Sequence, residues 1–425
     1  MRIYEYPQRE QWLDILKRPI QSDSQNEAVK EIIHAVVTNG DEALFKLSQQ
    51  FDGVEIKELR VTDAEIELAS GQVPEQLKQA IRNAKANIDK FHRSQVDSAE
   101  KIETTAGVWC WRRSLPIERV GIYVPAGSAP LFSTVLMLAV PAQIAGCKEI
   151  VMCVPPNTDG SVNDTVLFTA SLCGITDIYK IGGAQAIAAM AYGTESIPKV
   201  YKIFGPGNQY VTTAKKLVSV DVPIDMPAGP SEVAILADGS CAPSFVAADL
   251  LAQAEHGEDS QVVLVTDSNS VLNTVIEEID RQLEVLPRKA VAEAALRNSV
   301  GILVDTVESG LHLLNEYAAE HLILAVENAD EIAMKVKNAG SVFIGNYSCE
   351  SAGDYATGTN HTLPTGGYAR SYSGVSLDSF VKKITFQKLS AEGIKNIGPD
   401  VEILAKAEGL DAHKNAVSLR LKKLK

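Results

Sequence analysis

The pattern of hydrophobic and polar positions divides the chain into a helical beginning and a long region of alternating strands and helices. Over residues 26–52 and 74–95, apolar positions recur at helical spacing, which predicts that about the first 105 residues are mainly helical. From "ERVGIYVPAG" (residues 118–127) onward, short β-rich runs alternate with helical stretches. This alternation is typical of parallel sheets whose strands are joined by crossover helices.

The alternation occurs in two series. The first runs from "KEIVMCVPP" to "NQYVTTAKKLVS" (residues 148–219), and the second begins at "VAILAD" after "DMPAGPSE" and ends at "GSVFIG" (residues 233–345). We interpret them as two successive α/β units, although no repeat is visible residue by residue. The last segment, about residues 382–425, returns to a helical pattern and could fold against a neighbouring chain.

Composition narrows the class of protein. A chain of 425 residues predicts two or three domains, and 45% hydrophobic with 22% charged residues is ordinary for a globular protein. The formal net charge of −14 disfavours nucleic acid as a partner. Neither a signal peptide nor a run of about 18 apolar residues is found, so we expect a cytoplasmic protein without membrane contact. The six cysteines form no C-x-x-C pair, so a metal would need nitrogen and oxygen ligands.

Three glycine-bearing turns follow strands of the α/β region: "YVPAGSAP", "IGGAQA" and "FGPGNQY". Open parallel sheets bind ligands beyond the carboxyl ends of their strands, and the helix after each turn offers free N–H groups. Neither a G-x-G-x-x-G fingerprint with a downstream acidic residue nor a P-loop is present. Nucleotide binding and ordinary strand-to-helix turns therefore both remain open at this point.

The stretch "LLAQAEHGED" (residues 250–259) carries two polar side chains three positions apart. On a helix ending at Gly257, Gln253 and His256 would share one face. The pair is either half of a metal site or an ordinary helix end, where a histidine suits the helix dipole. Other segments must supply further ligands for the first interpretation to hold.

Further polar residues gather in three segments. In "YAAEHLIL", Glu320 and His321 stand where a helix runs into a strand, and could serve separate proton transfers or simply end the helix. The glycine- and threonine-rich connection over residues 350–370 brings Asp354 and His361, and long connections of this kind commonly carry function. "AEGLDAHKNAV" adds Glu408 and His413 near the end of the sequence. Zinc accepts histidine, carboxylate and, less commonly, amide ligands, although spacing alone does not show that these segments converge.

Taken together, these motifs resemble those of histidinol dehydrogenases of the bacterial type. The resemblance rests on "GPSEVAILAD", "QAEHG" with "DSQ", "AEHL", "ESAGDYATGTNHTLPTGGYAR", "EGL" and "AHKNA", and extends over the whole chain through "GIYVPAGSAPL", "GGAQAIAA" and "GPGN". It implies an α/β fold of two incomplete Rossmann-like parallel-sheet domains with helical segments at both ends. The expected division is residues 1–20 as an N-terminal helical arm, 21–121 plus 231–380 as the metal-binding and catalytic domain, 122–230 as the NAD-binding domain, and 381–425 as a C-terminal helical segment exchanged with a partner subunit.

The resemblance also implies an activity and the residues that carry it. The family oxidises L-histidinol to L-histidine through L-histidinaldehyde, the last two steps of histidine biosynthesis, with two NAD⁺ in succession and one zinc per site in a homodimer with shared active sites. The positions that match zinc ligands are Gln253, His256, Asp354 and His413, the last from the other subunit. Glu320 matches the residue that activates water, and His321 the acid–base residue. The substrate is contacted by the zinc ligands, by His321, and by Ser231, Glu350, His361 and Glu408, whereas NAD is contacted by Tyr123, Gln185 and Asn208.

The residues are also compatible with two other functions. One is a related zinc- and NAD-dependent dehydrogenase acting on another small polar alcohol. The other is an inactive metal- or nucleotide-binding protein, which the presence of both Glu320 and His321 disfavours. Glu408 favours a substrate with an amine, because a carboxylate complements an ammonium group.

Overall fold

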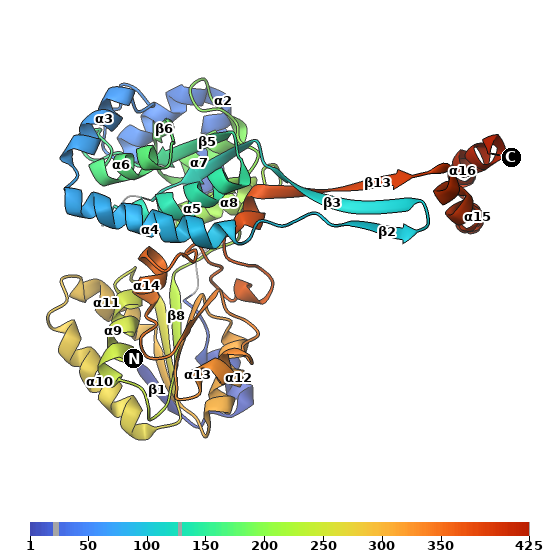
Figure 1. The fold of residues 1–425 in the computed structure, drawn as a ribbon. Helices are drawn as coiled ribbons and strands as arrows, with labels where there is room; N and C mark the ends of the chain where they lie inside the picture. The colour runs from blue at the N-terminus through green and yellow to red at the C-terminus, as the bar shows by residue number, and fades with distance from the viewer. Residues whose placement is uncertain (20–24, 126–129, 425) are drawn as a thin grey trace.

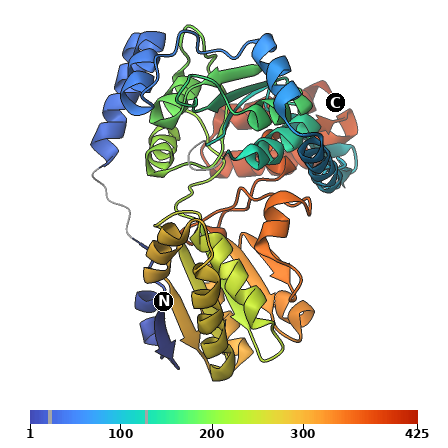
Figure 2. The same ribbon diagram turned by 90° about the vertical axis from the view of Figure 1, so that its left-hand side faces the viewer.

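The computed structural model describes residues 1–19, 25–125 and 130–424, and its two α/β units lie one above the other (Figures 1 and 2). The larger sheet is parallel, with the strand order β1-β10-β9-β8-β11-β12. Its strands are β1 (Arg2–Glu5), β8 (Glu232–Ala237), β9 (Gln261–Thr266), β10 (Val300–Leu303), β11 (His321–Ala325) and β12 (Ser341–Ile344). No helix in the described ranges is long and apolar enough to cross a membrane.

Helices cover both faces of this six-stranded sheet, because successive side chains of each strand point to opposite sides. Val233 and Ile235 of β8 face one core, and Ala234 and Leu236 face the other. The first face carries α9 (Pro243–Ala254), α10 (Asn269–Leu283) and α11 (Lys289–Arg297). The second carries α1 (Trp12–Ile15), which follows a short 3₁₀ turn at Arg9–Gln11, with α12 (Val307–Tyr317) and α13 (Ala329–Ala333).

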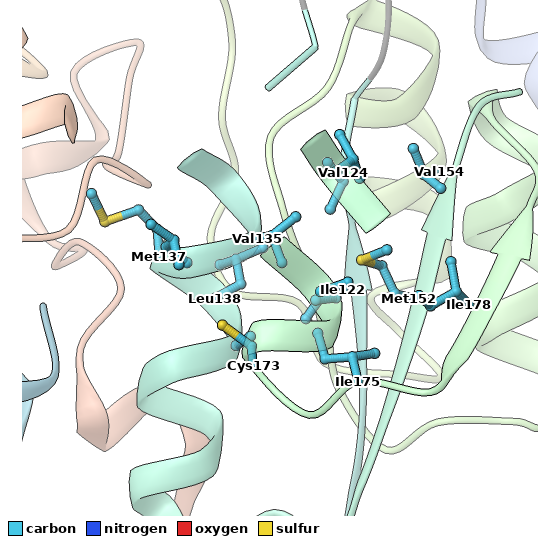
Figure 3. Packing of buried hydrophobic residues seen from close by; sticks show 14 of the residues in the cluster. Ile122, Val124, Val135, Met137, Leu138, Met152, Val154, Cys173, Ile175 and Ile178 are labelled. Carbon is cyan, nitrogen blue, oxygen red and sulfur yellow. The ribbon is translucent and has the colours of Figure 1, made fainter. Parts of the chain in front are cut away.

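The smaller sheet is also parallel and has the order β6-β5-β4-β7. Its strands are β4 (Arg119–Tyr123), β5 (Glu149–Val154), β6 (Asp177–Lys180) and β7 (Ile203–Phe204). One face packs on α3 (Asp63–Gln72), α4 (Glu75–Arg93), α5 (Phe132–Ala145) and α6 (Asp164–Leu172), and the other on α2 (Gln25–Phe51), α7 (Gly183–Tyr192) and α8 (Gln209–Val218). Figure 3 shows the first of these cores, where Ile122 and Met152 of the strands meet Val135 and Leu138 of α5.

A third, antiparallel sheet projects from the smaller unit as a long ribbon (Figure 1). Its strands are β2 (Lys101–Thr105), β3 (Val108–Pro116) and β13 (Val381–Leu389), in the order β13-β3-β2. The ribbon ends in α15 (Ala391–Ala407) and α16 (Asp411–Lys423), which pack on each other away from the body of the molecule. The connection from β12 to β13 contains α14 (Glu350–Tyr355) and two 3₁₀ turns, Tyr368–Arg370 and Leu377–Phe380.

The structure confirms the α/β class with two parallel sheets and helical terminal segments, and corrects three local predictions. The molecule begins with strand β1, which pairs in parallel with β10, rather than with a helix. Residues 101–105 and 382–389 are strands of the ribbon, not helix. Residues 382–389 pair along β3, which satisfies the backbone groups on the side of β13 that faces β3, and Phe386 stacks on Trp111 across the ribbon. Tertiary pairing therefore overrides the local pattern.

The expected grouping of residues 21–121 with residues 231–380 is also wrong for most of its described part. Helices α2, α3 and α4 pack on the smaller sheet, and strand β4 belongs to that sheet. The reason is the apolar face of each helix: Val29 and Leu44 of α2 join the core of α7 and α8, and Ile81 and Ile88 of α4 join that of α5. The boundary expected at residue 20 lies outside the described residues.

Candidate metal and catalytic site

The candidate site lies at the amino ends of β8 and β11, which are neighbouring strands of the larger sheet. Helix α12 ends at Tyr317, Ala318 takes a left-handed conformation with φ of 55°, and β11 begins at His321. The predicted helix-to-strand junction at Glu320 and His321 is therefore confirmed. Ligands of open parallel sheets usually lie at the carboxyl ends of the strands. This site lies at the opposite end of the sheet.

The backbone of Glu232, the first residue of β8, holds both junction residues. Its N–H donates to Glu320 Oε2 at 2.9 Å, and its carbonyl oxygen accepts from His321 Nδ1 at 3.2 Å. A proton on Nδ1 leaves Nε2 as the basic nitrogen of a neutral ring. His321 Nε2 is buried and has no hydrogen-bond partner among the described residues, so it is available to a ligand.

The Glu232 side chain is anchored by Arg18, a residue that the sequence analysis did not single out. The Arg18 guanidinium donates from Nε to Oε1 at 2.5 Å and from Nη2 to Oε2 at 2.9 Å, and Gly366 N–H donates to Oε1 at 2.7 Å. The carboxylate is 4% exposed. The one signal in the sequence was that Glu232, an acidic residue, begins a strand that is otherwise apolar, so its carboxylate would need a partner.

Gln253 and His256 meet as predicted, although α9 ends at Ala254, three residues before Gly257. Gln253 Nε2 lies 3.1 Å from His256 Nδ1, and Gln253 Oε1 is buried with no hydrogen-bond partner in the described structure. An orphaned buried oxygen is costly unless a ligand satisfies it. His256 itself is exposed and stands at the rim of the site.

Helix α14 delivers two carboxylates to the same place. Glu350 and Asp354 are four residues apart and so share a face of this helix, within a stretch for which the sequence analysis expected a loop. Ligand atoms of His256, Glu350 and Asp354 all lie within 4.8 Å of one another, and Glu350 Oε2 has no hydrogen-bond partner in the described part of the chain. These nitrogen and oxygen donors, together with the buried and unpartnered amide oxygen of Gln253, whose side chain contacts His256, fit a divalent ion such as zinc.

The charges of the cluster also favour a cation. His321 lies 3.7 Å from Glu320, 4.0 Å from Glu350 and 3.7 Å from Asp354, measured between nitrogen and carboxylate oxygen. Burial disfavours the charged ring, but the three carboxylates outweigh burial and raise the pKa of His321 to about 10. Burial likewise raises the pKa of Glu320 and of Glu350 to about 8, against the opposing attraction of His321. Burial of Asp354 also disfavours its charged form, but the attraction of His321 outweighs burial and lowers the pKa of Asp354.

His361 faces Asp354 and ties the site to the other unit. Its Nδ1 donates to the Asp354 carbonyl oxygen at 3.0 Å, and Thr134 Oγ1 on α5 lies 3.4 Å from its Nε2. Thr134 is a second residue that the sequence analysis missed. Ser231 precedes Glu232 and lines a cavity together with Arg18 and Gly366, so this predicted substrate residue adjoins the strand end that holds Glu320.

Two predicted residues are not brought to the site by this chain. Glu408 follows α15 and His413 lies in α16, and both are exposed at the far end of the ribbon (Figure 1). The ribbon carries these helices away from the unit that holds His256 and Asp354.

The three predicted cofactor residues lie at the carboxyl edge of the smaller sheet. Tyr123 ends β4, and its hydroxyl oxygen accepts from Gly183 N–H at 3.1 Å, which joins it to the start of α7, where Gln185 is buried. Asn208 caps α8, because its Oδ1 accepts from the N–H groups of Tyr210 and Val211 at 3.0 and 3.1 Å. Of the three glycine-bearing turns, the one after Tyr123 includes residues 126–129, which lie outside the described residues.

Comparison with known proteins identifies the family. The profile described as histidinol dehydrogenase matches residues 16–421. The chain belongs to the histidinol dehydrogenase family. It is 57% identical to a histidinol dehydrogenase of Bacteroides thetaiotaomicron over all of both chains, and 52% identical to one of Vibrio vulnificus over 96% of this chain and 95% of that protein.

Solved structures agree with this family assignment. The crystal structure of histidinol dehydrogenase from Elizabethkingia anophelis superposes with a TM-score of 0.98 at 54% identity, covering 100% of this chain and 98% of that one. An acetylating aldehyde dehydrogenase from Geobacillus thermoglucosidasius reaches a TM-score of 0.50 at 14% identity, over 89% of this chain and 93% of that one. The second likeness concerns the fold alone.

Proposed function

We propose that this chain is a cytoplasmic, NAD-dependent L-histidinol dehydrogenase that converts L-histidinol to L-histidine through L-histidinaldehyde, the last two steps of histidine biosynthesis. The observation that carries the proposal is the buried pair Glu320 and His321 beside the donor atoms of Gln253, His256 and Asp354, in a member of this family. Two bases next to one group of metal ligands suit two oxidations that differ in their proton transfers.

Gln253, His256 and Asp354, with His413 of the partner subunit, would hold one zinc ion per site. Bound zinc would hold the imidazole and the amine of the substrate, and bound NAD⁺ would accept the hydride from the carbinol carbon. The exposed position of His413 at the end of the ribbon supports a homodimer, because a second copy can receive residues that the first copy cannot use. Glu350 is a substrate contact in this assignment, although its position among the donor atoms would also allow it to reach the metal.

His321 is the acid–base residue of both oxidations. Its Nδ1–H bond to the Glu232 carbonyl oxygen fixes the ring, so that Nε2 faces the site and takes the proton of the substrate hydroxyl. The carboxylates favour a charged ring while no cation is present. A divalent cation among them counters that preference, so the loaded site has a neutral His321 ready to accept a proton.

Glu320 is the base of the second oxidation. It deprotonates the water that attacks the aldehyde, and His321 then takes a proton from the resulting gem-diol. Burial raises the pKa of Glu320 to about 8, and a base whose pKa lies near the working pH transfers protons efficiently. The bond from Glu232 N–H keeps one carboxylate oxygen fixed while the other is left for water.

The remaining predicted residues bind the reactants. Ser231, His361 and the partner's Glu408 contact the substrate, and a carboxylate near the substrate amine complements its charge. NAD would lie at the carboxyl edge of the smaller sheet, against Tyr123, Gln185 and Asn208, where the first turn of α7 has no side-chain cap and offers backbone N–H groups. The site thus joins two units of one chain and the end of a second.

Counting NADH per histidinol consumed tests the proposal. About two NADH per histidinol are expected, with activity lost after chelation and restored by Zn²⁺. About one NADH would limit the reaction to the alcohol step. Faster turnover of another small polar alcohol in a substrate panel would favour a related dehydrogenase, and no NADH with any alcohol would contradict the proposed function.

A further inference from the structure

The turn that leads from β7 to α8 is held by a buried ion pair outside the metal and catalytic site. Asp225 Oδ2 accepts from Gly205 N–H at 2.8 Å, and Lys215 Nζ donates to the Gly205 carbonyl oxygen at 2.6 Å. The two side chains also bind each other, with 2.5 Å between Lys215 Nζ and Asp225 Oδ1, and are 5% and 0% exposed. The pair therefore binds both the N–H and the carbonyl group of Gly205.

Gly205 occupies a position that requires glycine. Its φ is +123°, which side chains rarely allow, and a Cβ there would overlap the carbonyl oxygen of Tyr123. Three residues later, Asn208 caps α8. Gly205 thus lies between Tyr123 and Asn208, two of the residues assigned to the cofactor.

The two charged residues reach Gly205 from different elements. Lys215 lies in α8, and Asp225 lies on the segment that runs beside β7 after that helix. There Ile203 N–H donates to the Pro223 carbonyl oxygen, and Asp225 N–H donates to the Ile203 carbonyl oxygen, both at 3.0 Å. Residues 205–225 are therefore closed into a loop by contacts at Gly205, and α8 lies inside that loop.

Stability alone is a weak reason for such a pair. Replacing a buried ion pair by apolar residues is often neutral or stabilising, because removing two charges from water is expensive. What an apolar pair cannot do is bind an N–H and a C=O group at once. Fixing the peptide groups on either side of Gly205 fixes the direction in which the chain leaves β7.

We propose that Lys215 and Asp225 are positioning residues of the cofactor turn. By holding Gly205, they set the position of Asn208 and of the start of α8, and so the affinity for the nicotinamide cofactor. Neither side chain touches the cofactor. The inference rests on the proposed function in one respect, namely that NAD binds at this edge of the smaller sheet.

The test is the double variant Lys215→Met/Asp225→Asn in the full-length protein. It removes both charges of the pair together and keeps an acceptor for Gly205 N–H, but removes the donor to the Gly205 carbonyl oxygen. We expect the KM for NAD⁺ to rise about tenfold, since small displacements of positioning groups are costly. The KM for histidinol and kcat at saturating NAD⁺ should stay within about twofold.

The chain offers a matched control at the opposite, amino edge of the same sheet. Arg119 Nε lies 2.5 Å from Glu149 Oε2, and Arg119 Nη1 donates to the Lys199 carbonyl oxygen at 3.1 Å. The variant Arg119→Met/Glu149→Gln removes an ion pair that also binds a backbone carbonyl, and should leave the KM for NAD⁺ unchanged. Thermal melting of both double variants shows whether they remain folded to the same extent.

Each outcome decides the inference. A KM for NAD⁺ within about twofold of the wild type in the double variant overturns it, as does an equal rise in the control. Lys215→Arg, which keeps the charge and the donors, is the second test if the double variant does not fold: its KM for NAD⁺ should rise by about threefold or less, and a rise of tenfold or more would contradict the proposed role of the donor. Wild-type protein that fails to bind NADH in a fluorescence titration would refute the proposed function instead, before any variant is compared.

Discussion

Replacing Arg18 by methionine removes the partner of a carboxylate that supports the catalytic junction. Arg18 donates twice to Glu232, once to the Tyr317 carbonyl oxygen, and lies over the Tyr317 ring with 4.0 Å between the guanidinium carbon and the ring centroid. Among the described residues, the Arg18→Met variant leaves the buried Glu232 carboxylate with Gly366 N–H as its remaining hydrogen-bond donor. The variant therefore creates an uncompensated buried charge.

The size of the effect follows from these contacts. Breaking a buried ion pair by removing one partner costs about 3–5 kcal/mol, and the surviving bond from Gly366 places the loss near the lower end. Losing the cation–π contact adds about 0.5–1 kcal/mol. For a cooperative unit of 150–250 residues, each kcal/mol lowers Tm by about 2–4 °C. We expect Tm to fall by roughly 7–16 °C.

Scanning calorimetry measures this shift in Tm, and two further variants serve as controls. Arg9→Met breaks an exposed pair with Glu316, whose side chains are 76% and 33% exposed, and should cost less than about 1 kcal/mol. Arg18→Met/Glu232→Gln removes the unpaired charge and should recover more than half of the loss. The reasoning is refuted if Arg18→Met lowers Tm no more than Arg9→Met does.

Three further predictions concern the chemistry. Glu320→Gln should slow oxidation of supplied histidinaldehyde far more than oxidation of histidinol, by about 100-fold as for a lost general base; equal losses in both assays would count against its role. The pKa of Glu320 is raised to about 8, chiefly by burial, and a base must be deprotonated to act. Aldehyde oxidation should therefore increase with pH up to about 8, and a rate profile for Glu320→Gln with the same rising limb would contradict this. His256→Asn should lose most bound zinc by atomic absorption while the exposed His312→Asn keeps it; equal zinc contents would exclude His256 as a ligand.

The hydrophobic pattern was sufficient to predict the two parallel sheets. Strands such as β8 and β9 are buried along their whole length, and continuous apolar runs between amphipathic helices indicate that arrangement directly. The ribbon could not be predicted in this way. Strand β13 pairs with β3, more than 260 positions earlier in the chain, and its alternation of Ile384 and Phe386 with polar residues did not outweigh the helical character of the residues after Leu389.

Only those parts of the candidate site that lie within local sequence motifs could be predicted from the sequence. The junction at Glu320 and His321 and the contact between Gln253 and His256 follow from spacing along helices and strands. Arg18 could not be found, because its partner Glu232 is over 200 residues away and neither residue forms a motif. Spacing likewise gave no reason to place Glu350 beside His256, since that contact depends on how α14 packs near α9.

The most direct test of the account is whether two chains build one site. His256→Asn and His413→Asn chains should each be inactive alone, because each lacks a proposed zinc ligand. Mixed dimers should contain one intact site out of two, so equal mixing with random pairing restores about a quarter of all sites. That recovery of zinc binding and of histidinol-dependent NADH formation is the predicted result. No recovery in verified mixed dimers would contradict the account and place His413 in the site of its own chain or outside the site altogether.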